Sequence, residues 1–234
     1  MTQAVRWESS YRIIAAHLPR IDVFEQVADP ADLAAILEIE ALTNPRLLEV
    51  REAIRTVDPR DRVVGPGSTF VMAPFAYPRP SRFTDGTFGV YYAGECIDTA
   101  VAEHRHHREA FLSDTDEPPG VFDHRVIEAS IDAQLRDVSA EADAEALLHP
   151  DDYDRSRAYG SALHEAGEDG MVWPSVRRSG GFCIGLFKPR LARNAHSSYY
   201  LGYRWNGGSV YDVFRMESLT GTYPSEPPRE TPTS

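Results

Sequence analysis

The chain has 234 residues, of which 42% are apolar, and this composition is typical of one globular domain with a well-buried core. Its formal net charge is -12 and its 24 lysines and arginines are scattered along the chain, which argues against direct binding to nucleic acid. No apolar run reaches the length of about 18 residues needed to cross a membrane and no apolar leader is visible, so we expect a cytoplasmic protein that does not bind membranes.

The first quarter of the chain predicts one strand and two helices. The apolar segment 11–16 is typical of a short strand. Asp29 and Asn44 are candidate N-cap residues, each followed by a proline suited to the first helical position, and apolar residues follow at helical spacing. We therefore expect a helical hairpin near residues 30–56, inserted in a single domain that spans residues 1–216.

The next segment predicts a loop, a strand and a helix. Four prolines and two glycines between residues 65 and 80 exclude a long helix and favour a loop over the sheet. Beyond this loop we expect a strand over 88–93 and a helix over 99–112, with Asp98 as its N-cap. Glu103 would then lie in the second turn of this helix.

The second half of the chain predicts further strands and helices. They are a strand over 121–131, helices over 140–148 and 152–166, and a strand over 182–187. Nearer the end, Asn206-Gly207-Gly208 tolerates positive φ between two apolar runs, which predicts a β-hairpin over 199–214. Residues 217–234 are rich in Pro, Ser and Thr, so we expect a flexible tail.

Segment 81–107 and the first strand contain the groups needed to bind and cleave a dinucleotide such as NAD. Breaking a nicotinamide–ribose bond passes through an oxocarbenium-like state, so a carboxylate such as Glu103 can stabilise the developing charge or activate the nucleophile. Arginine presents a planar set of donors to a pyrophosphate, and Arg12 and Arg82 stand at suitable strand or loop positions.

Tyrosines accompany these residues and could stack on nicotinamide or bond to ribose. They are Tyr11, Tyr91 and Tyr92. Taken singly, each candidate has a simpler explanation, because a helix glutamate usually belongs to a solvated face and a strand tyrosine usually belongs to the core. Only the whole set therefore points to a function.

The order of these residues resembles the RES domain family. The similar motifs are YR at Tyr11-Arg12, SRF with Arg82, VYYAGECIDTAVAEH with Tyr92 and Glu103, and VWPSVRRSGGFCIGLFKP with Ser175. The SRF motif departs from the family's GRW-like pattern at its first and third positions. The resemblance implies an α+β, ADP-ribosyltransferase-like fold, with a split, twisted antiparallel β-sheet core and peripheral helices.

The resemblance also implies the site. NAD would be a co-substrate in a cleft between the sheet halves, and no metal is expected. The implied NAD-binding residues are Tyr11, Arg12, Arg82, Tyr92 and Ser175, and the implied catalytic residues are Glu103, Arg82 and Ser175. We expect the Ser175 hydroxyl to orient the glutamate or bond to the ribose rather than act as a nucleophile, because no His–carboxylate pair lies at a motif spacing around it.

Members of this family are toxins of bacterial toxin–antitoxin pairs, so the resemblance implies a toxin that cleaves NAD and transfers ADP-ribose to a cellular protein target. The alternative is an NAD glycohydrolase or phosphorylase, in which water or phosphate accepts the ADP-ribose. The extra length at 30–55 and 199–214 favours a protein target. The implied partner is a cognate antitoxin of the Xre helix-turn-helix type. Its acidic or carboxyl-terminal groups could meet arginines at the mouth of the cleft, namely Arg105, Arg108, Arg177 and Arg178.

Two more distant readings stay open. In one, Glu103 and the histidines His104, His106 and His107 form part of a metal-dependent hydrolase, with a distant ligand such as His124, His149 or His164. The simpler explanation is a polar helix face, and Cys96 and Cys183 are too far apart for a zinc motif. In the other reading, the chain is a binding module without catalytic activity.

Overall fold

The computed structural model describes residues 1–17, 24–25, 27, 29, 32–41 and 46–217 of the chain. In chain order the elements are β1 (Thr2–Ala15), α2 (Leu33–Ala41), α3 (Arg46–Arg55), η1 (Pro59–Asp61), α4 (Ser68–Ala76), β2 (Tyr91–Gly94), α5 (Ile97–Asp114), β3 (Gly120–Asp137), η2 (Val138–Ala140), α6 (Ala144–Leu147), α7 (Asp154–Glu165), β4 (Gly170–Pro174), β5 (Phe182–Leu186), η3 (Pro189–Leu191), β6 (Ala192–Trp205) and β7 (Val210–Met216).

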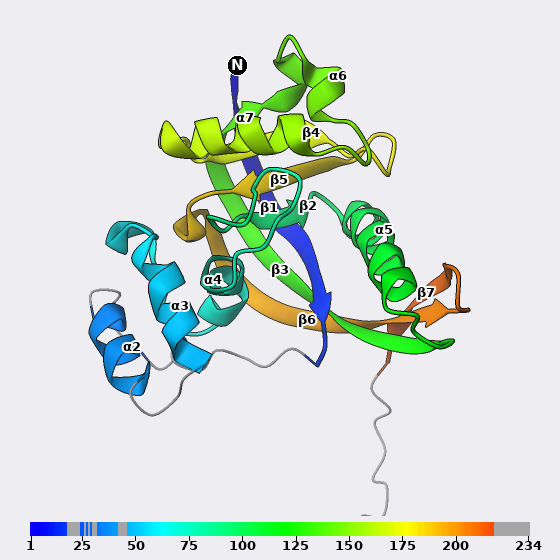
Figure 1. Cartoon of the computed structure of the whole chain (residues 1–234), viewed down its shortest axis with the longest axis horizontal. Coiled ribbons are helices and arrows are strands. Elements are labelled where there is room, and N and C mark those ends of the chain that lie inside the picture. The colour runs from blue at the N-terminus through cyan, green and yellow to red at the C-terminus, as the bar shows by residue number, and fades with distance from the viewer. Residues whose placement is uncertain (18–23, 26, 28, 30–31, 42–45, 218–234) are drawn as a thin grey trace, which may run out of the picture.

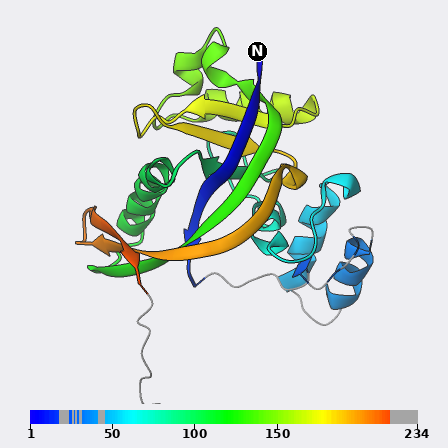
Figure 2. The ribbon, with the colours of Figure 1, turned by 180° about the vertical axis from the view of Figure 1, so that it is seen from behind.

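The sheet has two halves that meet near the centre of the molecule (Figure 1). Long, curved strands make one half, in the antiparallel order β1-β3-β6-β7, and Figure 2 shows β1, β3 and β6 side by side. The shorter strands β2, β5 and β4 make the other half. The halves join where Tyr11 pairs with Gly94 and where Arg136 of β3 pairs with Met171 of β4.

This arrangement confirms the expected α+β fold with a split, twisted sheet and peripheral helices. One detail of the prediction is wrong, because β3 and β4 pair in parallel and the sheet is therefore mixed. That pairing links strands 33 residues apart from the end of one to the start of the other, which a local pattern cannot reveal. The strand predicted over 182–187 is confirmed as β5, between β2 and β4.

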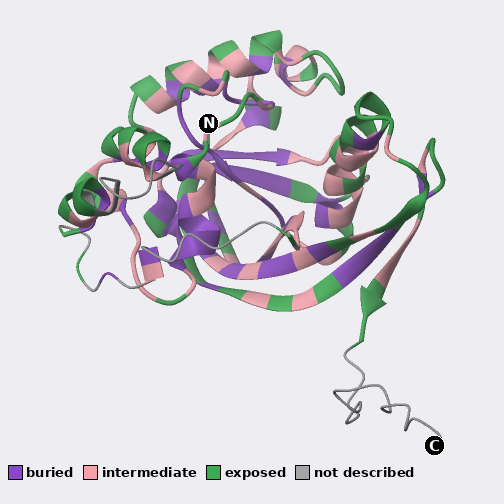
Figure 3. Ribbon diagram, turned by 60° about the horizontal axis from the view of Figure 1, so that its bottom comes forward, coloured by how far each residue is buried: buried purple, intermediate pink, exposed green. Residues whose placement is uncertain are grey.

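Helices cover both faces of the sheet, and buried residues lie where these helices pack against the strands (Figure 3). The helices α2, α3 and α4 share one apolar cluster with β1 and β3, which includes Ile127. The next residue back, Val126, points to the opposite face and packs in the cluster of α5. A third cluster joins α7 to β4 and β5. None of the described helices is both long and apolar enough to cross a membrane.

The helical hairpin predicted near 30–56 is confirmed as α2 and α3, which are linked by an ion pair of 2.6 Å between Arg55 Nη2 and Glu38 Oε1. Its description as an insertion stays a prediction. The β-hairpin is also confirmed, with Gly207 at a φ of 96° between β6 and β7. The predicted tail from residue 217 lies almost wholly outside the described residues.

The loop predicted over 65–80 is wrong, because residues 68–76 form α4. Gly67 permits this helix, since its φ is 82° and an added Cβ would lie 1.9 Å from the carbonyl oxygen of Ala195. Pro74 lies in the last turn, where it lacks the N–H that would donate to the Phe70 carbonyl. Most of the helix is buried, including Phe70 and Met72, and this burial outweighs its poor helix propensity.

Two further predictions need correction. The first strand is much longer than 11–16, because its N-terminal half pairs with the distant β3. The predicted N-cap Asp98 instead lies in the first turn of α5, and Cys96 occupies the N-cap position. Glu103 is still in the second turn, as predicted.

Candidate active site

A cavity of about 380 Å³ lies where β1 meets β2, bounded by α5, the start of α7 and the loop before β2. Its volume is in the lower range of small-molecule sites. Five of the six predicted site residues line it, namely Tyr11, Arg12, Arg82, Tyr92 and Glu103. The sixth, Ser175, is absent from the lining but contacts Glu103.

The crossing of β1, β2 and α5 brings these residues together. Tyr11 pairs with Gly94, the last residue of β2, and α5 starts three residues later. A Cβ on Gly94 would lie 2.8 Å from the backbone nitrogen of Ala100, so glycine is needed for this close approach. The second turn of α5 therefore lies beside β1, and it carries Glu103 into the cavity.

Glu103 is held by the Ser175 hydroxyl, which donates to Glu103 Oε1 over 2.6 Å. The same hydroxyl accepts from the backbone N–H groups of Arg177 at 3.2 Å and Arg178 at 3.0 Å. A serine hydroxyl has one hydrogen and two lone pairs, so these three contacts use its full capacity. Ser175 therefore orients the carboxylate, and no described residue donates a hydrogen bond to Glu103 Oε2.

Cys183 provides a second, weaker contact to the same carboxylate oxygen. Its Sγ lies 3.8 Å from Glu103 Oε1, and the residue lines the cavity. Burial, with a smaller contribution from the Glu103 charge, raises the pKa of the Cys183 thiol. The thiol therefore stays protonated at neutral pH and can only donate toward Glu103.

Arg12 is enclosed in the cavity wall without a counter-charge. Its Nη1 donates to the Tyr92 carbonyl oxygen over 3.2 Å, its Cζ lies 5.3 Å from the centre of the Tyr91 ring, and its buried Nε has no partner. Among the described residues, no carboxylate pairs with it. Burial lowers the pKa of Arg12, because the charged form has lost water. An anionic ligand would offset this cost, and the site thus fits a phosphate.

Arg82 lines the cavity but both of its terminal nitrogens are engaged. Nη1 donates to the His149 carbonyl over 2.7 Å and Nη2 donates to the Pro150 carbonyl over 3.3 Å. Its Cζ lies 4.4 Å from the centre of the Tyr153 ring. The residue is only 7% exposed, so in this structure Arg82 fastens the loop before α7 to the cavity wall.

Tyr92, like Arg82, holds a loop against the cavity wall. Its hydroxyl lies 2.9 Å from Ser81 Oγ and accepts from the Phe83 N–H over 3.1 Å, while its ring meets Trp173 edge-on. Burial raises the pKa of Tyr92 to about 12. The phenol is therefore neutral and fixes the loop that carries Arg82, and its predicted contact with nicotinamide stays a prediction.

The histidines of α5 face different neighbours. His104 Nδ1 lies 3.2 Å from the Tyr203 hydroxyl, with the His104 ring edge-on to His124, and burial lowers the pKa of His104 well below its ordinary value. His106 Nε2 instead lies 2.7 Å from an Arg177 nitrogen. Within the described ranges, no group of three His, Cys, Asp or Glu side chains could hold a metal ion.

Three of the four arginines expected at the mouth already have acidic partners. Arg105 pairs with Glu109 at 3.0 Å, Arg177 with Asp151 at 3.0 Å, and Arg178 more loosely with Asp98. The fourth, Arg108, lies over the rings of two phenylalanines. Their recruitment of an acidic partner stays a prediction.

Sequence reasoning missed several cavity residues, namely Tyr153, Arg157, Trp173 and Ile184. A signal was present for the first two, because an aromatic residue and an arginine four positions apart share one helix face. Trp173 directly precedes the Pro-Ser motif, but an apolar strand residue in a core gives no functional signal.

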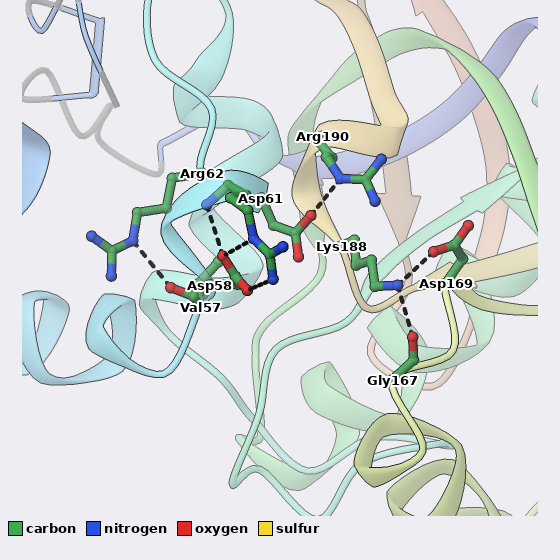
Figure 4. A network of polar contacts seen from close by, with 9 residues as sticks. Val57, Asp58, Asp61, Arg62, Gly167, Asp169, Lys188 and Arg190 are labelled. Atoms are coloured by element: carbon green, nitrogen blue, oxygen red, sulfur yellow. Dashed lines mark hydrogen bonds and ion pairs between the residues drawn. The ribbon is translucent and has the colours of Figure 1, made fainter. Parts of the chain in front are cut away.

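A larger cavity of about 600 Å³ lies between α4, α7 and η3. Its charged rim is cross-linked, as Figure 4 shows. Arg190 pairs with Asp61, and Lys188 pairs with Asp169 at 2.6 Å and donates to the Gly167 carbonyl over 2.7 Å. The remaining arginine of the rim, Arg60, pairs with Asp58 at 2.7 Å, so each of these cations has an acidic partner, in contrast to the unpaired Arg12 of the smaller cavity.

Comparisons with known proteins agree with the sequence motifs. A family model described as the RES domain matches residues 59–206. A protein of Sinorhizobium fredii, described as uncharacterized protein y4oC, is 29% identical over 213 residues, which cover 88% of this chain and 87% of that protein. A chain in the crystal structure of the M. tuberculosis MbcT-MbcA toxin-antitoxin complex is 12% identical, with a TM-score of 0.44 and coverage of 87% of each chain.

Proposed function

The chain belongs to the RES domain family, and from this premise we propose that it is the toxin of a toxin–antitoxin pair, which cleaves the nicotinamide–ribose bond of NAD and transfers ADP-ribose to a cellular protein. One observation carries the proposal. Glu103 is fixed by Ser175 through a 2.6 Å hydrogen bond, and the carboxylate lines a cavity whose wall contains an arginine without a counter-charge.

The proposed chemistry uses the two oxygens of Glu103 differently. Oε1 is held by Ser175, whereas Oε2 is available to the substrate. As the C–N bond breaks, its electron pair leaves with nicotinamide and the ribose becomes an oxocarbenium-like cation, which the carboxylate stabilises. The acceptor then attacks the anomeric carbon, and its proton passes to Glu103 as general base.

The charge balance of the cavity supports a substrate with a pyrophosphate. Among the described residues of its lining, three arginines (Arg12, Arg82 and Arg157) face a single carboxylate, Glu103. This excess of positive charge would attract the two phosphates of NAD. The neutral tyrosines and the apolar strand residues of the lining suit the uncharged parts of the substrate.

A protein side chain is the proposed acceptor. The hairpin of α2 and α3 and the hairpin of β6 and β7 lie outside the cavity lining and add surface on which a protein target can dock. Water or phosphate would make the same site a glycohydrolase or a phosphorylase. We further propose that the toxin acts in the cytoplasm and that a cognate antitoxin of the Xre helix-turn-helix type neutralises it.

The proposal is tested by incubating the purified protein with NAD labelled in its adenylate part, in the presence of a cell lysate. A labelled protein band supports transfer to a protein. Free ADP-ribose or its 1-phosphate in place of a band would replace the transferase by one of the two alternatives. An intact NAD pool, together with a wild-type gene that is harmless when expressed alone, would contradict the proposal and favour a binding module.

A further inference from the structure

Arg157, which no motif predicts, stands at the cavity with its terminal nitrogens free of backbone contacts. It follows Tyr153 by one helical turn at the start of α7 and lines the cavity. Its Nε donates to the Ser81 carbonyl over 3.0 Å, which fixes the direction of the guanidinium. The only described ion pair is with Asp154 at 3.9 Å, and that carboxylate is 91% exposed, so it neutralises little charge.

The three arginines of the cavity therefore differ in what they can offer a ligand. Arg82 has both terminal nitrogens on carbonyl oxygens, and Arg12 has one on the Tyr92 carbonyl. Arg157 has its stem fixed and both terminal nitrogens available. Because bidentate binding of a phosphate needs two adjacent N–H donors, Arg157 is the best prepared of the three.

Tyr153 joins two of these arginines. Its ring centre lies 4.4 Å from the Cζ of Arg82 and 5.8 Å from the Cζ of Arg157. A ring face attracts a cation without neutralising it, in contrast to a carboxylate. Two guanidinium groups thus contact one ring that does not neutralise them, and their positive charge at the cavity remains available to an anion.

We propose that Arg157 and Tyr153 form an anion subsite, in which Arg157 binds the pyrophosphate of a dinucleotide substrate and Tyr153 positions its guanidinium. Arg82 contributes charge and holds the loop that carries Tyr153. This inference rests on the proposed function, since it assigns the part of the cavity that binds the phosphates of NAD.

The test measures binding in a Glu103→Gln background, in which NAD is not consumed, by titration calorimetry. Arg157→Gln should weaken binding of NAD and ADP-ribose by about tenfold or more, because it removes charge-assisted hydrogen bonds. Binding of nicotinamide, which has no phosphate, should not change. Arg155→Gln is the matched control, since Arg155 is exposed on the same helix and has no hydrogen bond or ion pair among the described residues.

Three more variants separate the charge of Arg157 from the geometry of the subsite. Arg157→Lys keeps the charge but loses the planar donor pair, so its affinity for ADP-ribose should lie between those of the wild type and Arg157→Gln. Tyr153→Phe keeps the ring and should bind as the wild type does, whereas Tyr153→Leu should bind more weakly. A thermal melt of each variant confirms that it is folded.

Equal affinities of folded Arg157→Gln and Arg155→Gln for ADP-ribose would overturn the subsite and leave the proposed function intact, provided that the wild type cleaves NAD. If the wild type neither binds nor cleaves NAD, the proposed function itself fails. The two failures are therefore distinguishable.

Discussion

Glu103 and Arg12 line the same cavity but are held in different ways. The carboxylate has a strong hydrogen bond from Ser175 and a weak contact from Cys183, both on Oε1. The guanidinium has one carbonyl contact, a ring face and a buried nitrogen without a partner. The first arrangement fixes the direction of one group, as a reaction requires, whereas the second preserves positive charge, as anion binding requires. Mutations in the two regions should therefore change different quantities.

The largest effect is expected for Glu103→Gln, which keeps the shape of the side chain but removes its charge. Turnover of NAD should fall by about 100-fold to 10,000-fold, because neither the ribosyl cation nor the acceptor proton meets a carboxylate. Initial rates of nicotinamide release measure this loss. Asp114→Asn, at the exposed end of the same helix, serves as the control and should retain wild-type rates.

The next largest effect is a loss of stability at low pH. Burial lowers the pKa of His124 from its ordinary 6.5 to about 4. Between these pH values the unfolded chain binds a proton at this histidine, whereas the folded protein does not. The free energy of unfolding should thus fall by up to about 3 kcal/mol between pH 6.5 and pH 4. His104 adds to this effect with the same sign.

Urea denaturation at several pH values tests this prediction. His124→Asn removes the titrating group and offers an amide N–H in place of the Nδ1–H that meets the Phe122 carbonyl at 2.9 Å. The variant should show a flatter pH dependence than the wild type. An unaltered slope in His124→Asn would refute the explanation.

A smaller loss is expected when the orientation of Glu103 is relaxed. Ser175→Ala removes the donor to Oε1 and the acceptor for two backbone N–H groups, so turnover should decrease by about 10-fold to 100-fold. Ser175→Thr keeps the hydroxyl and should recover part of the rate. The KM for NAD should change little, and Ser113→Ala on the exposed face of α5 should have no effect. A tenfold rise in KM at constant turnover would instead assign Ser175 to substrate binding.

The smallest loss of function is expected when Arg12 is replaced, and this replacement should not destabilise the fold. Arg12→Met should weaken NAD binding by about tenfold. Because the arginine is desolvated without a carboxylate, its removal should leave the free energy of unfolding unchanged within about 1 kcal/mol or raise it. Thermal and urea denaturation measure this directly. If the free energy of unfolding falls by more than about 2 kcal/mol, Arg12 stabilises the fold. That result would contradict the role of Arg12 as an unpaired charge kept for an anionic ligand.

Local patterns explain which parts of the fold could be predicted from sequence. Asn206-Gly207-Gly208 specifies a turn by its own conformational preferences, so the hairpin of β6 and β7 was predictable. The helix α4 was not, because it contains Pro74 and directly follows Gly67, so its stability comes from burial against α3 and β6 rather than from its own helix propensity. The N-terminal half of β1 depends in the same way on its pairing with β3, more than 100 residues further along the chain.

The candidate site divides in the same way. Glu103, Ser175 and Arg12 were predicted because motifs carry them, and the structure places Glu103 and Arg12 at one cavity with Ser175 in contact with Glu103, while their roles stay predictions. The engagement of Arg82 with the carbonyls of His149 and Pro150 could not be foreseen, since it depends on where a distant loop packs. The Tyr153–Arg157 pair had a signal in its helical spacing, but nothing in the sequence related that helix face to the cavity.

The most direct test of the account measures NAD affinity and single-turnover nicotinamide release on the same samples of wild type, Glu103→Gln and Arg12→Met. We expect Glu103→Gln to bind NAD with nearly wild-type affinity but release almost no nicotinamide, and Arg12→Met to bind weakly but react at close to the wild-type rate once saturated. If affinity and rate fall together in both variants, the division of the cavity into a reacting carboxylate and a binding arginine is contradicted.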